Sequence, residues 1–331
     1  MKILIISDAW KPQVNGVVNS LNMTCIKLRE IGHKIEVIGP DKFKTFPCPS
    51  YPSIRLSLFP KKKLLSIIDE YKPDSIHIAT EGPLGQAARK ICLNNKWRFT
   101  TSYHTQFPEY IKARIPIPLS ISYFFLKRFH SKAEKTLVPT KSMAEKLKDK
   151  GFKNIAIWSR GVDKNIFKPS KVKINNKRKK AVYFGRVSPE KNIEAFLNTN
   201  LNIEKIVIGD GPSLAKLKEE YPEVIFLGEK FGRELSKIVA ESDVFVFPSK
   251  TDTFGIVIIE ALACGVPVAA YPVTGPKDII EHEVTGYLSD NLDRAIIGAL
   301  KINRNNCIQE SMKYSWENCS KQFETSLSLI T

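Results

Sequence analysis

The chain has 331 residues and a formal net charge of +17, with 43% hydrophobic and 26% charged residues. This length suits about two domains of ~150 residues, and the composition is that of ordinary globular proteins. No apolar stretch approaches the ~20 uninterrupted residues of a membrane span. The six cysteines form no CxxC pair and have no histidine at ligand spacing, so neither a zinc motif nor a disulfide framework is indicated, and a reducing cytoplasm fits best.

The positive charge is concentrated in residues 1–165, whereas the second half is nearly balanced. A basic surface attracts phosphate polyanions, so nucleic acid and an anionic membrane leaflet are candidate partners. Ile115–Phe129 combines apolar and basic residues and could lie on such a leaflet, although a core helix and solvated lysines explain the same pattern. We expect a cytoplasmic protein, with a peripheral position on the inner face of the cytoplasmic membrane as an alternative.

The first residues, MKILIISDAW, lack the apolar stretch of a signal peptide, so we interpret them as a first strand. Val17–Ile31 is amphipathic and is followed by Gly32, which predicts a helix with a glycine C-cap. Short β-branched runs then alternate with helix-length segments, the pattern of a parallel sheet with crossover helices. In residues 1–167 the predicted strands are Lys2–Ser7, Lys34–Gly39, Ser75–Ala79, Arg98–Tyr103, Thr136–Pro139 and Ile155–Trp158.

Residues 168–180, KPSKVKINNKRKK, are polar and highly charged, which predicts a basic linker. The alternation then restarts, so residues 181–312 are predicted to form a second doubly wound domain. Residues 313–331 contain a predicted terminal helix, Ser315–Leu327, that packs back on the first domain. The predicted strands of the second domain are Ala181–Gly185, Lys205–Gly209, Val224–Leu227, Asp243–Phe247, Pro267–Tyr271 and Gly286–Leu288.

The loops that follow the strands are where a site is expected, because open parallel sheets bind ligands at the carboxyl ends of their strands. After the first strand, Asn15-Gly16 precedes a helix whose N–H groups and positive dipole end favour an anion such as phosphate. A glycine before a helix is also a common turn device. The loop lacks a GxGxxG pattern, which argues against a dinucleotide fingerprint.

A second polar loop, TSYHTQFPEY, places His104 just after a predicted strand and Glu109 a few residues later. A histidine there can hydrogen-bond a sugar hydroxyl or transfer a proton near neutral pH. Structural histidines are common, so a purely structural role stays open. We place Glu109 and Asn15 on the acceptor side as a hypothesis.

A third loop, FGRVSPEKN, follows the first strand of the second domain and carries Arg186 and Lys191. A cationic pair at this position can bind a diphosphate and offset the charge that develops on a leaving group. A solvated turn is the alternative.

The fourth loop belongs to PSKTDTFGIVIIEALACGVPV and gives the strongest pattern. Gly255 lets the backbone approach a ligand, and the amides of Gly255 and Ile256 point out of a helix N-terminus. Asp252 and Glu260 can reach the same ligand, and carboxylates suit sugar and ribose hydroxyls. Glu260 also interrupts an apolar helix, where a carboxylate needs a partner.

In combination, GRVSPEKN, IVIGDGPS and TDTFGIVIIEALACGVPV resemble the second-domain motifs of family 4 glycosyltransferases. The front-half motifs DAWKPQVNGVV, HIATEGPLGQAAR, TSYHTQFPEY and the segment at Arg160–Pro169 resemble a bacterial branch of GDP-mannose-dependent α-mannosyltransferases and related lipid glycosyltransferases. The resemblance covers nearly the whole chain. It implies an α/β chain with the GT-B fold, in which two Rossmann-like doubly wound domains face each other across a cleft.

The resemblance also implies roles for individual residues. Arg186 and Lys191 would bind the donor diphosphate, and Glu260 the ribose. Asp252 and the backbone of Phe254, Gly255 and Ile256 would hold the transferred sugar, although the family usually has glutamate where Asp252 stands. Gly16 would offer its amide to the phosphate, and His104 would lie near the sugar.

The implied reaction is a front-face transfer of a hexose with retention, without a metal or other cofactor. Mannose from GDP-mannose is the predicted donor group and a membrane lipid or glycan the predicted acceptor. A UDP-sugar-dependent diacylglycerol glycosyltransferase that transfers glucose or sulfoquinovose is the alternative within the class. A nucleotide-sugar epimerase or a basic nucleic-acid-binding protein is the alternative outside it, although no nucleic-acid module is recognisable.

Overall fold

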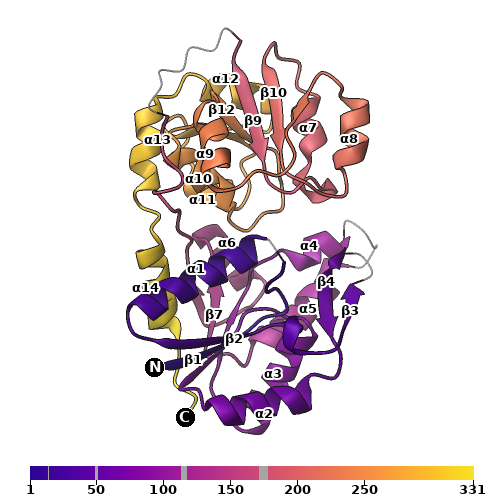
Figure 1. Cartoon of the computed structure of the whole chain (residues 1–331), viewed down its shortest axis with the longest axis vertical. Helices are drawn as coiled ribbons and strands as arrows, with labels where there is room; N and C mark the ends of the chain where they lie inside the picture. Colours follow the sequence, from indigo (N-terminus) through magenta and orange to yellow (C-terminus); the bar gives the residue numbers. More distant parts are fainter. Residues whose placement is uncertain (14, 49–50, 113–117, 171–177) are drawn as a thin grey trace. The chain divides into compact units, whose positions relative to one another are not determined.

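The computed structural model describes residues 1–13, 15–48, 51–112, 118–170 and 178–331, which form two compact units (Figure 1). The N-terminal unit comprises Met1–Arg160 and Trp316–Thr331, and the C-terminal unit comprises Gly161–Ser315. Each is a parallel α/β domain. Within the described ranges, no helix is long and apolar enough to span a membrane.

The N-terminal unit is built on a six-stranded parallel sheet in the order β2-β1-β5-β6-β7-β8. Its central strands are the most deeply buried: Lys2–Ile6 is an aliphatic run with four of five residues buried, and all four residues of Ser75–Ile78 are buried, as a sheet covered on both faces requires. The order reverses at β1, so β1 and β5 flank the topological switch point. The strands are β1 (Lys2–Ile6), β2 (Lys34–Ile38), β5 (Ser75–Ile78), β6 (Thr100–Ser102), β7 (Lys135–Val138) and β8 (Ile155–Ile157).

A separate antiparallel hairpin, β3 (Thr45–Cys48) and β4 (Tyr51–Ser57), was not predicted from the sequence. The helices of this unit are α1 (Gly16–Glu30), η1 (Pro40–Lys42), α2 (Lys61–Tyr71), α3 (Pro83–Asn94), α4 (Phe107–Lys112), α5 (Leu119–His130) and α6 (Lys141–Asp149).

The last helix, α14 (Trp316–Ser326), belongs to the N-terminal unit and lies along α1 (Figure 1). Trp316, Cys319 and Phe323 are buried with Leu21 and Trp158 in one apolar cluster. The chain end is also tied to the sheet, because Ile330 N donates to Asp74 O at 3.0 Å.

The C-terminal unit has a second six-stranded parallel sheet, in the order β11-β10-β9-β12-β13-β14. This is the doubly wound order in which β9 and β12 flank the switch point. The strands are β9 (Lys180–Phe184), β10 (Glu204–Ile208), β11 (Ile225–Phe226), β12 (Val244–Phe247), β13 (Val268–Ala270) and β14 (Gly286–Leu288). The helices are η2 (Pro189–Lys191), α7 (Ile193–Leu197), α8 (Leu214–Glu220), α9 (Gly232–Ala240), α10 (Ile256–Ala263), α11 (Pro276–Ile279), α12 (Leu292–Ala299) and α13 (Arg304–Ser311).

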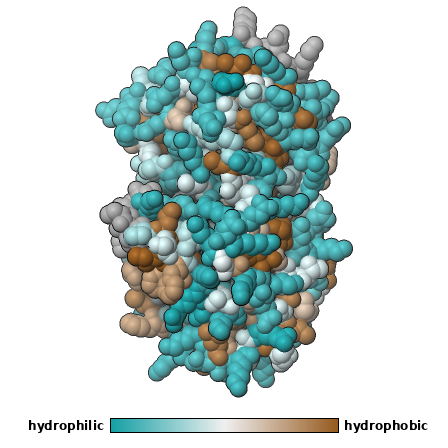
Figure 2. Space-filling model, turned by 180° about the vertical axis from the view of Figure 1, so that it is seen from behind, coloured by the Kyte–Doolittle hydropathy of each residue, from teal (hydrophilic) through white to brown (hydrophobic). Residues whose placement is uncertain are grey.

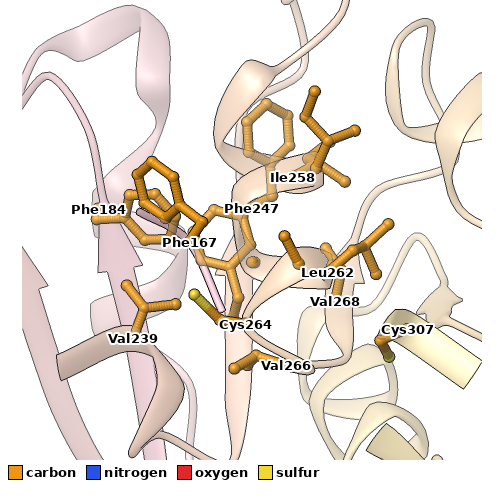
Figure 3. Close-up of a cluster of buried hydrophobic side chains, with 14 of the residues drawn as sticks. Phe167, Phe184, Val239, Phe247, Ile258, Leu262, Cys264, Val266, Val268 and Cys307 are labelled. Carbon is orange, nitrogen blue, oxygen red and sulfur yellow. The ribbon is translucent and has the colours of Figure 1, made fainter. Parts of the chain in front are cut away.

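One face of this sheet carries the apolar cluster shown in Figure 3, where Ile258 and Leu262 of α10 gather with Phe247 of β12. Both α10 side chains are 0% exposed, and each fully buried aliphatic side chain stabilises a fold by roughly 1.5–3 kcal/mol. The core therefore fixes the position of α10.

The first segment of the N-terminal unit ends at Arg160, whereas the sequence placed the domain boundary at 167. Val162 and Phe167 explain the difference, because both are buried in the core of the C-terminal unit. Within the predicted linker, residues 171–177 lie outside the described residues, and Lys180 already starts β9.

Candidate active site

Two loops of the C-terminal unit border its switch point, where doubly wound sheets bind ligands. The loop after β9 holds Arg186 and Lys191, and the loop after β12 holds Asp252. Lys191 Nζ lies 2.6 Å from Asp252 Oδ1, with the two side chains 21% and 15% exposed. Asn192 Nδ2 also donates to Pro248 O at 3.0 Å. The structure therefore brings together the two loops that the sequence singled out.

The Arg186 loop is held by groups that the sequence analysis missed. The buried Tyr183 on β9 donates its hydroxyl to Arg186 O at 2.7 Å, while the Arg186 side chain is exposed. A Cβ on Gly209 would lie 1.9 Å from Gly185 O, and one on Gly211 would lie 2.2 Å from Val187 O. Only glycine allows this packing. The signal was the GDG run that follows β10.

The loop before α10 turns through Gly255, whose φ of +89° favours glycine. Phe254 is buried at 4% exposure and its carbonyl packs against Gly275, where a Cβ would lie only 2.8 Å from Phe254 O. Ile256 is the first residue of α10. Gly275 is therefore another missed residue that shapes this loop, and its signal was the TGP sequence after β13.

Glu260 occupies the partly buried face of α10. Burial raises the pKa of its carboxyl from 4.5 to about 7. Among the described parts of the chain, no group forms a hydrogen bond with this carboxyl. A carboxylate in such surroundings gains from a ligand that supplies hydroxyl donors.

In the N-terminal unit, Asp8 joins the two loops at the switch point. Its carboxylate accepts from Thr80 Oγ1 at 2.9 Å and from the α3 backbone at Leu84 N and Gly85 N, at 2.8 and 3.2 Å. Burial, the largest influence, raises the pKa of Asp8. These bonds fix the loop that leads toward Asn15 and Gly16.

Asn15 is the N-cap of α1. Its Oδ1 accepts from Val17 N and Val18 N, both at 3.0 Å, so these two amides are already engaged by the cap. Gly16 is exposed at the start of the helix. An interaction of the Gly16 amide with phosphate stays a prediction.

His104 lies in the loop after β6, and Glu109 lies in the short helix α4 that follows this loop. Glu109 Oε1 accepts from Tyr123 Oη at 2.7 Å and from Lys146 Nζ at 2.6 Å, which ties α4 to α5 and α6. The Nδ1 atom of His104 lies 3.2 Å from Arg160 Nη2. The acceptor-side role of Glu109 stays a prediction, and the structure adds that Glu109 holds three helices together.

The described residues contain no group of three or more His, Cys, Asp or Glu side chains placed to hold a metal ion. Arg186 and Lys191 place two positively charged side chains on the loop beside the switch point. Such a pair can bind a diphosphate.

Comparison with known proteins identifies the class. A model described as Glycosyltransferase Family 4 matches residues 14–165, and one described as Glycosyl transferases group 1 matches residues 164–307. The fold is shared with sucrose-phosphate synthase from Thermosynechococcus elongatus, at a TM-score of 0.77 and 19% identity over 98% of this chain and 97% of that one. Anabaena HepE, solved in complex with UDP, matches with a TM-score of 0.74 and 18% identity over 98% and 99%. The protein is a glycosyltransferase with the GT-B fold.

Sequence relatives define the family more closely. The chain is 32% identical to a GDP-mannose-dependent alpha-mannosyltransferase from Corynebacterium glutamicum, over 88% of this chain and 78% of the relative. It is 31% identical to the sulfoquinovosyl transferase SQD2 of Arabidopsis thaliana, over 82% of this chain and 60% of that protein. The chain belongs to the family 4 glycosyltransferases, as its motifs predicted.

Proposed function

We propose that this glycosyltransferase transfers mannose from GDP-mannose, with retention, to a lipid or glycan acceptor at a membrane surface. The observation that carries the proposal is the pairing of Lys191 with Asp252 at the switch point of the C-terminal unit. The similarity to GDP-mannose-dependent mannosyltransferases supports the choice of donor.

In this proposal Arg186 and Lys191 bind the donor diphosphate and stabilise the charge that develops as it leaves. Asp252 and the backbone at Phe254, Gly255 and Ile256 hold the sugar, and Glu260 accepts from the ribose hydroxyls. Because two cationic side chains neutralise the leaving group, we propose that no metal ion is needed. Turnover should then survive an excess of EDTA, and its loss with recovery on adding Mg²⁺ would contradict this part.

The donor is tested by thermal unfolding in the presence of GDP, GDP-mannose, UDP, UDP-glucose and UDP-sulfoquinovose. A ligand that binds only the folded state stabilises that state and so raises Tm. At a hundredfold excess of ligand over Kd, the free energy of unfolding increases by about 2.7 kcal/mol. We expect GDP and GDP-mannose to raise Tm and the UDP compounds to have little effect. Stabilisation by UDP-glucose or UDP-sulfoquinovose alone would replace the proposal with a diacylglycerol glycosyltransferase, the function class of other relatives.

An epimerase is separated from a transferase by incubating the sugar nucleotide alone. A transferase should leave the sugar configuration of GDP-mannose unchanged when no acceptor is present. Conversion to a second nucleotide sugar would contradict the proposed transfer.

The membrane part of the proposal rests on exposed apolar and basic residues in two segments of the N-terminal unit. Phe59, which precedes α2, is 94% exposed, and Phe124 and Phe125 on α5 are 61% and 64% exposed. Lys61–Lys63 and the pair Lys127-Arg128 are exposed beside them in sequence. Figure 2 shows apolar colouring gathered at the lower left of the molecule, on the side where Figure 1 places α5 after the half-turn. Residues 115–117 of the predicted membrane segment lie outside the described residues.

Aromatic side chains beside lysines favour an anionic bilayer surface, at about 1 kcal/mol per basic residue. Neutralising Lys61–Lys63, Lys127 and Arg128 should weaken sedimentation with phosphatidylglycerol vesicles by at least tenfold. Neutralising Lys216, Lys218 and Lys301 of the C-terminal unit is the control and should change little. Equal binding of the two variants would contradict the membrane surface.

A further inference from the structure

Arg160, which ends the first of the two segments of the N-terminal unit, is a buried arginine with a fixed side chain. It is 5% exposed, and its Nη1 donates to Trp158 O at 2.6 Å and to Ser159 O at 2.9 Å. Its guanidinium carbon lies 4.4 Å from the centroid of the Trp158 ring. Two hydrogen bonds and a cation–π contact therefore hold the guanidinium in one place.

The backbone that receives Arg160 is itself anchored by α14. Gln322 Oε1 accepts from Ser159 N at 2.8 Å, and Cys319 Sγ donates to Ser159 O at 3.1 Å. The Trp158 ring packs on Phe323 with centroids 4.9 Å apart. Arg160 is thus positioned by the fold, independently of any ligand.

The remaining end of the guanidinium faces His104, with Arg160 Nη2 at 3.2 Å from His104 Nδ1. A guanidinium has only N–H donors and no acceptor. Burial lowers the pKa of Arg160 to about 10, so the group still carries its proton at neutral pH. His104 Nδ1 must accept this hydrogen bond, which leaves the single ring proton of neutral His104 on Nε2.

We propose that Arg160 is a positioning residue that holds His104 as the neutral Nε2–H tautomer, so that His104 donates a hydrogen bond to a substrate oxygen and does not act as a proton acceptor. This inference rests on the proposed function, in which His104 lies near the transferred sugar. The sequence left two roles open for His104, hydrogen bonding and proton transfer. This inference assigns hydrogen bonding to His104. The acceptor of that hydrogen bond is a hydroxyl or phosphate oxygen of the sugar nucleotide.

The surroundings of His104 also oppose a positive ring. Burial, then the charges of Arg160, His77 and His130, lower the pKa of His104 well below its ordinary value of 6.5. His77 hydrogen-bonds Thr100 and Ser102, and burial lowers its own pKa to about 3. His130 contacts Thr101 Oγ1 and, at 3.2 Å, Glu81 Oε1. The rings of His104 and Trp158 also meet edge to face, with their centroids 5.5 Å apart.

The tautomer is measured by long-range ¹H–¹⁵N correlation spectra of protein labelled at histidine nitrogens. The chain has five histidines, and the signal lost in His104→Gln assigns His104. We expect neutral His104 with its proton on Nε2, unchanged from about pH 6 to about pH 9. A proton on Nδ1, or a ring that becomes charged in this range, would overturn the proposal.

Arg160→Met keeps an apolar stem over Trp158 and removes every donor. We expect it to mix the two tautomers of His104 and to lower kcat by about 10- to 100-fold through loss of positioning. Arg160→Lys retains a positive donor and should restore the Nε2–H signal and part of kcat. Retention of that signal and of full turnover in Arg160→Met would contradict the positioning role.

Arg89→Met is the matched control, because Arg89 also donates to main-chain oxygens in this unit, at Phe129 O and Arg128 O. It should leave the His104 spectrum unchanged even if it lowers Tm. If Arg160→Met does not fold, the spectra of the wild type and of Arg160→Lys still show whether His104 carries its proton on Nε2. The spectra need no donor or acceptor, so failure of the GDP-mannose assignment is distinguishable from failure of this inference.

Discussion

Lys191 Nζ and Asp252 Oδ1, 61 positions apart in the chain, lie 2.6 Å from each other at the switch point of the C-terminal sheet. The pair links the cation expected to bind diphosphate to the carboxylate expected to bind the sugar. Because each side chain is only partly exposed, the pair is less screened by water than a surface ion pair. The two groups should therefore act on the donor as a unit.

The first prediction concerns this unit. Lys191→Met and Asp252→Asn should each lower kcat/KM by roughly 10²- to 10³-fold, and the double variant should be no worse than the poorer single variant, because coupled groups are not additive. Steady-state kinetics of the three variants checks this. Lys216→Met, which removes an exposed pair with Glu194, is the control, and independent, multiplying losses at Lys191 and Asp252 would contradict the coupling.

The second prediction concerns Glu260, whose pKa is raised from 4.5 to about 7 by burial. A raised folded-state pKa favours the folded protein below pH 4.5, and this contribution is lost as pH rises through about 7. Glu260→Gln should therefore match the wild-type free energy of unfolding near pH 4.5 and exceed it at pH 8 by up to about 3 kcal/mol. Denaturant unfolding of the ligand-free protein at both pH values measures this difference.

Although Glu260→Gln should be more stable than the wild type at pH 8, its affinity for the donor should be lower. Glu260→Gln is expected to bind GDP-mannose more weakly at pH 8, and wild-type affinity should increase as Glu260 ionises near pH 7. A variant that is more stable at pH 8 and still binds the donor as tightly as the wild type would exclude Glu260 from the ribose site.

The third prediction concerns Tyr183, whose hydroxyl holds Arg186 O at 2.7 Å. Tyr183→Phe removes one buried hydrogen bond, worth about 1 kcal/mol, and should raise the KM for the donor several-fold. The matched control is Tyr221→Phe, which removes an exposed bond to Asn198. Equal donor KM values for these two variants would show that Tyr183 does not position the Arg186 loop.

The fourth prediction compares two glycines with positive φ. Gly275→Ala places a Cβ 2.8 Å from Phe254 O, whereas Gly228→Ala meets nothing within 4 Å. Gly228→Ala should lose about 1 kcal/mol of stability through backbone strain. Gly275→Ala should lose more, because its Cβ also meets the backbone, and it alone should weaken donor binding. Thermal unfolding with and without GDP-mannose separates the two effects, and equal ligand-induced shifts would contradict the role of Gly275.

The sequence predicted the six strands of each parallel sheet because most are short runs rich in β-branched or aliphatic residues between turn residues. It missed the β3–β4 hairpin, since Pro47 and Pro52 argue against a strand, although a two-stranded ribbon outside the main sheet tolerates them. The domain boundary differs because the charged run after Phe167 suggested a linker, while burial of Val162 and Phe167 assigns their segment to the C-terminal core.

At the site, strand-end position and residue chemistry were enough to single out Lys191 and Asp252. Gly209 and Gly275 were not assigned a role because each packs against a loop distant in sequence, and local patterns do not encode such contacts. Tyr183 is only three residues from Arg186, but it lies inside a buried strand, where an aromatic residue is expected for packing alone. Arg160 was noticed only as part of a segment. Its contact with His104 depends on the packing of α14, which joins the unit from the far end of the chain.

In this account the C-terminal unit binds a GDP-sugar through Arg186 and Lys191. Titration calorimetry of GDP-mannose into the wild type and into the variant with Arg186→Ala and Lys191→Ala measures this binding. We predict that the wild type binds and that the double variant binds at least about 100-fold more weakly, since two charged hydrogen-bonding groups are lost. Equal affinity of the two proteins for GDP-mannose would contradict the assignment of this site.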